Sequence, residues 1–543
     1  MIPAALLVVT IPLIGALLAY GLRRWQAIEI GVAVLSCVAA IVLLARPLES
    51  VISIPGASLG IALDAPLDVL GRVLRVRPED RIPIILLFAV SAVLFVLSWR
   101  TPQGWPFVPV GLVVLAAMSL ALLIRPFVYA ALAFEGAAAL AALMIQAERS
   151  GERSGLGALR YLSVVTLSLP LFLFAGWSID RAGAVNLNDA EAVATAYGTA
   201  MLLLIGGFGL ILGAIPLYTW VHPVARDAPP LTTAFLATVG VGTPTFLMLE
   251  FWQAYEWLRT SQQAASALTV GGIALLLFGG GLAWVQSTFS RVMACAILVE
   301  IGCLLLLMTG NSQLSVEALT FAMLARALSL GVFGLGVSRL RTLRSSDGFA
   351  EARGVRDMWT VAALGVGGLS LAGLPGTLGF VSRWAAARAY GFADVEGLAL
   401  LIAASASIGI GTLRGLIAMF DAPAIEGVVE EAPTSSQLSL FEGRDAISDA
   451  NDDAINDAVN DAVNDAVNDA VNGSDDLPLL EGETLIEGES SAQVQAWSPH
   501  QPDSLGARLI VGAGVAAVII LGIWPGAIAP VAKAAAAQYG FYP

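Results

Sequence analysis

Long apolar segments constrain this chain more than any other feature of its sequence. Runs of about 18 to 25 apolar residues, each able to cross a hydrocarbon core of about 30 Å as a helix, recur along the chain. The hydrophobic share of 57%, the charged share of 13% and the mean hydropathy of +0.80 lie outside the range of soluble domains. The sequence therefore predicts an all-α polytopic membrane protein with about fourteen transmembrane helices. The approximate spans are 3–21, 28–46, 82–99, 106–124, 127–146, 157–178, 196–220, 229–252, 266–286, 291–309, 314–338, 358–386, 397–420 and 505–529.

The first span has no basic segment before it and no convincing small-residue cleavage site after it. We therefore expect it to remain as a membrane helix and not to be removed as a signal peptide.

The net charge of −14 comes from one segment. Residues 421–503 contain 20 acidic residues and one basic residue, Arg444, so the rest of the chain carries 27 basic and 22 acidic residues. The centre of this segment repeats Val-Asn-Asp-Ala, which would place aspartates at repelling i,i+4 positions of a helix built from weak helix formers. We expect a disordered acidic insert. A docking tail for a basic partner is the alternative.

Arginine placement predicts the orientation, because short cytoplasmic loops are enriched in Lys and Arg. The arginines follow mainly the odd-numbered spans, so both termini should face outside and the acidic insert should face the cytoplasm. The residues concerned are Arg23, Arg24, Arg100, Arg149, Arg153, Arg226, Arg339, Arg341, Arg344, Arg353 and Arg356. The segment after the second span disagrees, since it contains Arg72, Arg75, Arg77 and Arg81. It also contains four acidic residues, and longer loops follow the rule less strictly.

Four ionisable residues lie well inside predicted spans: Glu135, Glu300, Arg326 and Arg383. A charge within a bilayer is expensive and marks either a conduction pathway or a structural ion pair. We take these four as candidate proton-pathway residues, with structural pairing as the alternative. Three others lie nearer to span ends, where snorkelling to the interface explains them: Glu250, Glu317 and Arg414.

Two prolines occupy comparable places in glycine-rich spans. Pro216 lies in the glycine-rich segment from Gly206 to residue 220, and Pro375 lies in the glycine-rich segment from Gly365 to residue 384. About five spans separate the two prolines. A proline interrupts a helix and frees carbonyl groups that need a polar environment. Paired broken helices in two halves indicate repeated transporter units with a polar path at the breaks. A packing kink is the alternative.

We expect no cofactor, no metal site and no nucleic-acid partner. Cys37, Cys295 and Cys303 lie within apolar spans, with no cysteine or histidine at metal-ligand spacing. No glycine-rich phosphate loop follows a predicted strand. Without a redox centre, the chain should not catalyse electron transfer by itself.

Several motifs together resemble the antiporter-like subunits of respiratory complex I. Residues 207–220 read GFGLILGAIPLYTW and residues 228–236 read APPLTTAFL, similar to that family's G-F-x-x-K-x-x-x-x-P-x-H-x-W and A-P-x-P-V-S-A-x-L. Residues 371–383 read LAGLPGTLGFVSR, similar to L-A-G-x-P-x-T-x-G-F-x-x-K. Residues 291–302 resemble the family's K-R-x-x-A-Y-S-S-I-x-x-x-G segment. The motifs lie between about 111 and 420.

The resemblance implies two inverted five-helix repeats with discontinuous helices, and a hydrated axis of charged residues near the membrane midplane. Glu135 matches the family's fifth-helix carboxylate and Arg383 matches its twelfth-helix lysine. The family's seventh- and eighth-helix lysines correspond to Ile211 and approximately to Val241, and the histidine after the proline corresponds to Tyr218.

These departures matter because Lys533 is the only lysine in the chain. A buried lysine can release its proton, whereas an arginine stays protonated. A negative charge has been gained at Glu300, where the family usually has a neutral polar residue or histidine.

The resemblance implies a non-catalytic membrane subunit of an NADH:quinone oxidoreductase-type translocase in the cell inner membrane, in contact with the lipid bilayer and with other membrane subunits. It would take part in proton translocation in a respiratory chain, through an altered or impaired pathway. A component of a multisubunit cation/proton antiporter or membrane-bound hydrogenase, and a non-pumping scaffold paralogue, are the alternatives. The expected organisation is 1–105 N-terminal helices and external loop, 106–252 first antiporter-like repeat, 266–420 second antiporter-like repeat, 421–503 acidic insert, and 504–543 C-terminal helix and tail.

Overall fold

The computed structural model describes residues 2–421 and 504–539, apart from 54–59, 70, 126–128, 148–154, 185–189, 215–217, 311 and 391–394. Nearly all of the acidic insert and its predicted disorder lie outside the described residues, as does Pro216.

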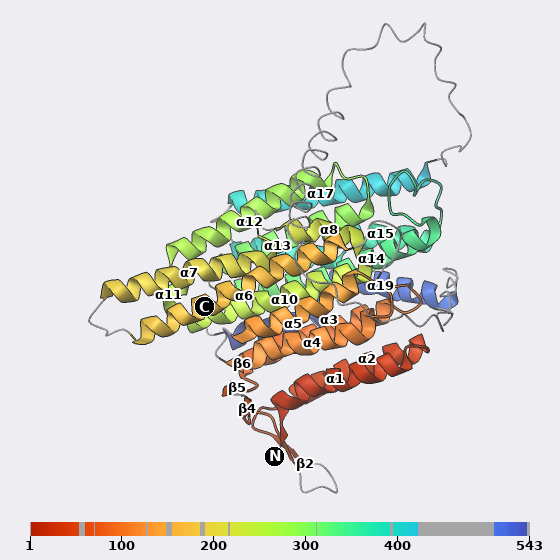
Figure 1. The fold of residues 1–543 in the computed structure, drawn as a ribbon. Helices are drawn as coiled ribbons and strands as arrows, with labels where there is room; N and C mark the ends of the chain where they lie inside the picture. The colour runs from red at the N-terminus through yellow and green to blue at the C-terminus, as the bar shows by residue number, and fades with distance from the viewer. Residues whose placement is uncertain are drawn as a thin grey trace, which may run out of the picture. The chain divides into compact units, whose positions relative to one another are not determined.

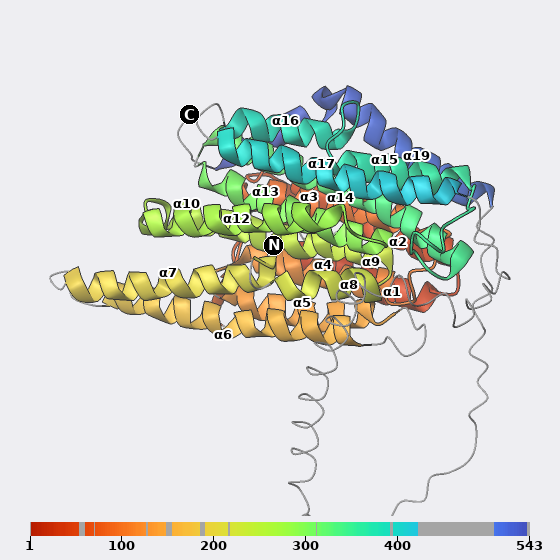
Figure 2. The same ribbon diagram turned by 90° about the horizontal axis from the view of Figure 1, so that it is seen from above.

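Helices dominate the described chain and run side by side along a common direction (Figures 1 and 2). Before the second half they are α1 (Ala4–Leu22), α2 (Gln26–Leu44), α3 (Pro78–Leu97), α4 (Phe107–Leu123), α5 (Ala130–Ile145), α6 (Leu156–Ala184), α7 (Ala190–Leu212), α8 (Val221–Asp227), α9 (Pro230–Phe235), α10 (Val241–Ala254) and α11 (Glu256–Arg259). A π-helical turn, Leu236–Gly240, joins α9 to α10, and a 3₁₀ turn, Tyr218–Trp220, precedes α8.

The remaining helices are α12 (Gln262–Ala283), α13 (Phe289–Thr309), α14 (Gln313–Arg344), α15 (Met358–Leu371), α16 (Leu378–Tyr390), α17 (Val395–Phe420), α19 (Leu505–Ile523) and α20 (Ala529–Gln538). Within the described residues, eleven helices are long and apolar enough to span a membrane, and three shorter apolar helices accompany them. The predicted polytopic all-α class is confirmed. The count of fourteen spans and the inverted relation of the repeats stay predictions.

Two small β-sheets were not predicted from the sequence. In the first, β3 (Gly60–Ala62) lies between β1 (Ile2–Pro3), which is parallel to it, and the antiparallel β2 (Val51–Ser53). In the second, β5 (Arg72–Leu74) lies between β4 (Leu67–Val69) and β6 (Ile124–Arg125), both antiparallel. The second sheet fixes the residue after α4 beside the segment that leads into α3.

Burial separates an inner set of helices from an outer set. Within their most apolar windows, the segment through α9 and α10 is fully buried, and 94% of the residues of α13 and 89% of those of α14 are buried. In the corresponding windows of α1, α2, α6, α12 and α19, only 28–39% of the residues are buried. Large apolar side chains are exposed there, such as Leu17 on α1, and also on α17, which packs against α12 and exposes Ile402. Such surfaces suit contact with lipid, where backbone groups are satisfied inside each helix.

The helices α7 and α15 end in the same way. At the end of α7, Gly213 adopts a φ of +69°, its N–H donates to Leu210 O (3.2 Å), and the N–H of Ala214 donates to Gly209 O (2.8 Å). At the end of α15, Gly373 adopts a φ of +73°, with donation from Gly373 N to Ser370 O (2.9 Å). Leu374 N then donates to Leu369 O at 3.0 Å. These are the two bonds of a Schellman motif, which needs glycine at the left-handed position.

Each interrupted helix is the fourth long helix of its half, since α4 to α7 precede the first break and α12 to α15 precede the second. Pro375 lies in the second interruption, between Leu371 and Leu378. In the first half, α7 ends at Leu212 and the next described turn begins at Tyr218, and Pro216 falls among the undescribed residues 215–217.

The connection between α14 and α15 is held by an ion pair. Asp357 caps α15 by accepting hydrogen bonds from Thr360 N (3.0 Å) and Thr360 Oγ1 (2.6 Å), and Arg339 Nη2 donates to the same carboxylate oxygen (2.8 Å). Partial burial opposes ionisation of Asp357, but the hydrogen bonds from Thr360 and Arg339 outweigh it and hold the pKa of this carboxyl below its usual value.

Replacing Asp357 should therefore destabilise the fold, and the loss should be larger for D357A than for D357N. D357N keeps a capping oxygen and loses the charge, whereas D357A loses both, and the lost cap alone costs about 1 kcal/mol. Thermal unfolding of the purified protein should rank wild type above D357N and D357N above D357A. Because the folded-state pKa is lowered, the charge contribution is complete above about pH 3.9, and it is lost as the pH falls through the folded-state value. Equal unfolding temperatures at neutral pH would show that the ion pair does not stabilise the fold.

Candidate functional site

A buried ion pair lies beside the second interrupted helix. Arg383, on α16, forms a salt bridge with Glu300, in the middle of α13. The Arg383 guanidinium also donates to Ser405 Oγ on α17 (2.9 Å) and to Leu371 O at the end of α15 (3.3 Å). Four helices therefore meet at one side chain, which is 9% exposed.

The interruption explains why a cation fits there. The end of α15 leaves carbonyl groups without a helical partner and has partial negative charge, both of which favour a guanidinium. Gly373 also makes room for the arginine, because a Cβ at that position would lie 2.7 Å from Arg383 Cγ. The glycine thus serves both the left-handed turn and the passage of the side chain.

Arg326, on α14, adds a second positive charge to this cluster. Its side chain is 1% exposed, and none of its three guanidinium nitrogens has a hydrogen-bond partner among the described residues. It interacts electrostatically with Glu300. Two guanidinium groups therefore face one carboxylate, and neither guanidinium can readily release a proton.

Glu135 lies apart from these three residues. It is on α5, half-buried, and accepts a hydrogen bond from Thr166 Oγ1 on α6 (2.8 Å). Its second oxygen is buried and has no hydrogen-bond partner within the described chain, and Tyr161 lies close enough to interact with it electrostatically. The structure thus brings together Glu300, Arg326 and Arg383, and none of the described contacts joins Glu135 to them.

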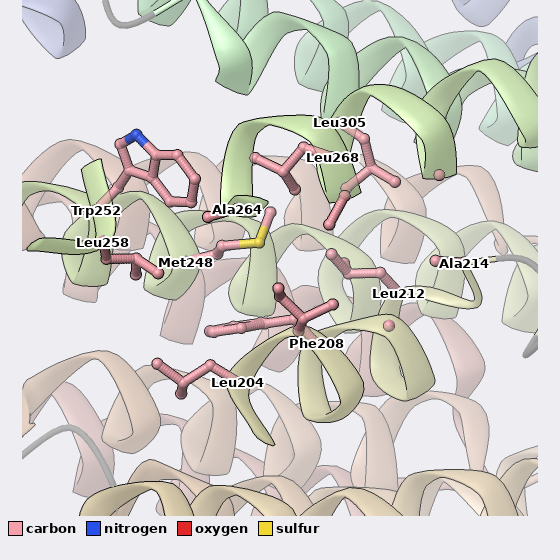
Figure 3. A pocket seen from close by; sticks show the side chains of 14 residues that line it. Leu204, Phe208, Leu212, Ala214, Met248, Trp252, Leu258, Ala264, Leu268 and Leu305 are labelled. Atoms are coloured by element: carbon pink, nitrogen blue, oxygen red, sulfur yellow. The ribbon is translucent and has the colours of Figure 1, made fainter. Parts of the chain in front are cut away.

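The first interrupted helix has apolar surroundings instead of charges. Ile211 and Val241, at the positions of the two family lysines, are 5% and 1% exposed. A cavity of about 60 Å³ lies beside the end of α7 (Figure 3). Apolar side chains from α7, α10, α12 and α13 line it, among them Leu204, Phe208, Leu212, Met248, Leu268 and Leu305. No ionisable group lines this cavity.

A larger and more polar cavity lies beyond the first break. It measures about 490 Å³, and its lining includes Tyr218, His222, Arg160, Arg226 and Arg291. The sequence did not reveal that His222 lies against Cys295, with Nε2 and Sγ 3.7 Å apart. Thr238 is buried within the π-helical turn, and its hydroxyl donates to Ala234 O at 2.7 Å.

Glu250 was expected to snorkel toward the interface, and this interpretation is wrong. It is 2% exposed and forms a salt bridge with Arg125 at 2.9 Å. Arg125 also forms a salt bridge with Asp80, on α3, at 2.9 Å. Asp80 and Arg125 were not predicted as site residues from the sequence, because each lies at a helix end in the chain. Burial of that end under the C-terminal segment, including Tyr539, could not be read from hydropathy.

Two interrupted helices, buried charges beside one of them and mostly membrane-length helices define a polytopic subunit of the antiporter-like class. The family model described as "NADH:quinone oxidoreductase/Mrp antiporter, TM" matches residues 127–410, more than half of the chain. The chain belongs to this family, which confirms the resemblance seen in the motifs.

Relatives named NADH-quinone oxidoreductase subunit N agree with this assignment. NADH-quinone oxidoreductase subunit N of Ectopseudomonas mendocina (strain ymp) is 31% identical over 225 residues, which cover 39% of this chain and 44% of that protein. The subunit of the same name from Halorhodospira halophila is 25% identical over 303 residues, covering 53% and 62%. The chain thus spans about half the length of the curated relatives it matches.

Solved structures share the fold over almost the whole chain. The Mrp complex from Dietzia sp. DQ12-45-1b includes a chain with a TM-score of 0.69 and 15% identity, covering 99% of this chain and 97% of that one. Respiratory complex I from Thermus thermophilus with bound aureothin includes one with a TM-score of 0.62 and 18% identity, covering 97% and 99%. At these identities the likeness establishes the fold alone.

The charge balance of the second-half cluster predicts an order of stability. E300Q would leave two buried guanidinium groups without a carboxylate and should cost about 3–5 kcal/mol. R383Q should cost less, because Arg326 remains to balance Glu300, and R383K should cost least because it keeps the charge. Denaturant titration of the purified protein in detergent tests this order, with R24K at the exposed Arg24 as the control. If R383Q proves more destabilising than E300Q, Arg326 does not compensate Glu300.

Proposed function

We propose that this chain is a membrane-arm subunit of a complex I-like respiratory assembly and contributes to proton translocation coupled to quinone reduction. The observation that carries the proposal is the buried Glu300–Arg383 pair beside an interrupted helix, with Arg326 next to it. Buried charges at a helix break in a membrane fold mark an ion pathway. The family membership and the relatives named subunit N support the same function.

We propose Glu135, Glu300, Arg326 and Arg383 as the residues of the pathway, arranged in two halves, 106–252 and 266–420. The carboxylates would exchange protons, because arginines cannot do so at accessible pH. Arg326 and Arg383 would set the field around Glu300. In the first half, Glu135 would reach the polar cavity that contains Tyr218 and His222, as a substitute for the missing lysines.

We also propose other membrane subunits as partners, because proton translocation coupled to quinone reduction needs a quinone-reducing partner to supply energy. The scaffold alternative is favoured by one observation, the apolar cavity and the buried Ile211 and Val241 in the first half. If the first half does not conduct, only the second half would move protons.

Replacing Glu135 separates these possibilities. E135Q should lower proton pumping several-fold in the assembled complex, because Gln keeps the hydrogen bond to Thr166 but cannot exchange a proton. Assembly should be unchanged, since Glu135 makes no ion pair among the described residues. Pumping per electron transferred is measured in reconstituted vesicles, with the exposed E256Q as the matched control. Wild-type pumping by E135Q would remove the first-half carboxylate from the pathway and favour the scaffold function there.

The arginine distribution supports a location in the inner membrane with both termini outside and the acidic insert in the cytoplasm. A cysteine placed near Gly473, in a variant lacking the three native cysteines, should react with a membrane-impermeant maleimide only after the cells are opened. A second cysteine, at the exposed Asp64, should react in intact cells. Labelling of the Gly473 position from outside would invert the proposed topology.

A further inference from the structure

Asp80, Arg125 and Glu250 form a buried trio at one end of the helix bundle. Asp80 lies in the first turn of α3, Arg125 follows α4 in β6, and Glu250 lies four residues before the end of α10. The side chains of Asp80 and Glu250 are 0% and 2% exposed, and that of Arg125 is 11% exposed. No proposed pathway residue belongs to this trio.

The hydrogen bonds distinguish the two carboxyl groups. Asp80 accepts at both oxygens: Oδ1 from Arg125 Nη2 (2.9 Å) and Oδ2 from the backbone N–H of Arg77 (3.0 Å). Glu250 accepts from Arg125 at Oε2 (2.9 Å), whereas its buried Oε1 receives no hydrogen bond from the described residues. Asp80 thus has the surroundings of an ionised carboxylate at a helix N-terminus. Glu250 does not.

The charges of the trio do not balance unless one carboxyl carries a proton. Two acidic groups share one guanidinium, Arg125 Nη2, which lies 2.9 Å from Asp80 Oδ1 and 2.9 Å from Glu250 Oε2. Two close carboxylates in a buried site resist joint ionisation, so a proton on one of them would restore the balance. Among the described residues, Glu79 and Tyr539 also interact electrostatically with the trio, and neither supplies a positive charge.

We propose that Glu250 holds a proton on Oε1, the buried oxygen that no described donor reaches, so that the trio is a proton-binding site at this end of the bundle. Glu250 is on the same helix as Val241, the position at which the family has a lysine. It lies nine residues after Val241, which is a rise of about 13 Å along the helix axis. As a step in translocation, which rests on the function proposed above, the site would exchange protons at the end predicted to face outside.

Infrared spectroscopy of the full chain in lipid vesicles tests the bound proton without any measurement of transport. The wild type should show the C=O stretch of a protonated carboxylic acid, shifted in D₂O, and E250Q should lose it. D80N should also lose it, because Glu250 would then face Arg125 alone and ionise. The matched control E256Q, six residues away and exposed, should keep it.

A second measurement needs no variant. A membrane-soluble carbodiimide reacts with protonated carboxyl groups, so mass spectrometry of the labelled wild type should find the adduct on Glu250 and none on Asp80. An unchanged infrared band in E250Q, or an adduct on Asp80 alone, would overturn the assignment even if every variant folds.

The role in transport has its own outcome. In the assembled complex, E250Q should lower pumping several-fold while E256Q pumps as the wild type does. If E250Q loses the infrared band but pumps normally, the proton is structural and the exchange role is wrong. A wild-type complex that does not pump at all would contradict the proposed function. The infrared and carbodiimide measurements would still decide whether Glu250 carries a proton.

Discussion

The need to satisfy backbone carbonyl groups where a helix stops inside an apolar bundle determines much of this structure. At both interruptions a Schellman motif, with Gly213 or Gly373 at its left-handed position, provides hydrogen bonds to two of the last carbonyl groups. The surroundings of the other carbonyl groups differ between the two interruptions. At the second break Arg383 donates to Leu371 O and brings Glu300 with it. At the first break the end of α7 lies beside an apolar cavity, and the charged groups line a separate cavity beyond it.

Hydropathy predicted the helices well because membrane length and apolar composition leave few alternatives. The predicted span 291–309 became Phe289–Thr309, and 358–386 became two helices separated around Pro375. The two small sheets were missed because strands of two or three residues carry no periodic pattern. The second sheet matters for the buried trio, because β6 places Arg125 against Asp80.

Residue type identified Glu300 and Arg383 as unusual, but the sequence could not show that they pair, because 83 positions separate them. The prediction that Glu250 reaches the membrane interface was wrong for a different reason. Distance from a helix end is a guide to exposure only when nothing covers that end. Here Arg125 and the segment around Tyr539 cover it, so a carboxyl near the end of α10 is as buried as one in the middle of α13.

The two buried clusters have opposite imbalances of charged groups, and this difference suits them to different chemistry. Around Glu300 there is one more guanidinium than carboxylate, and an arginine cannot correct the excess by losing a proton. Around Arg125 there is one more carboxyl than guanidinium, and a carboxyl can correct the excess by gaining one. Lys533 is the only lysine in this chain, so the proposed pathway depends on carboxyl groups. In that pathway, Arg326 and Arg383 would set the proton affinity of Glu300 through a fixed positive field, whereas Glu135 and Glu250 would exchange protons outside that field.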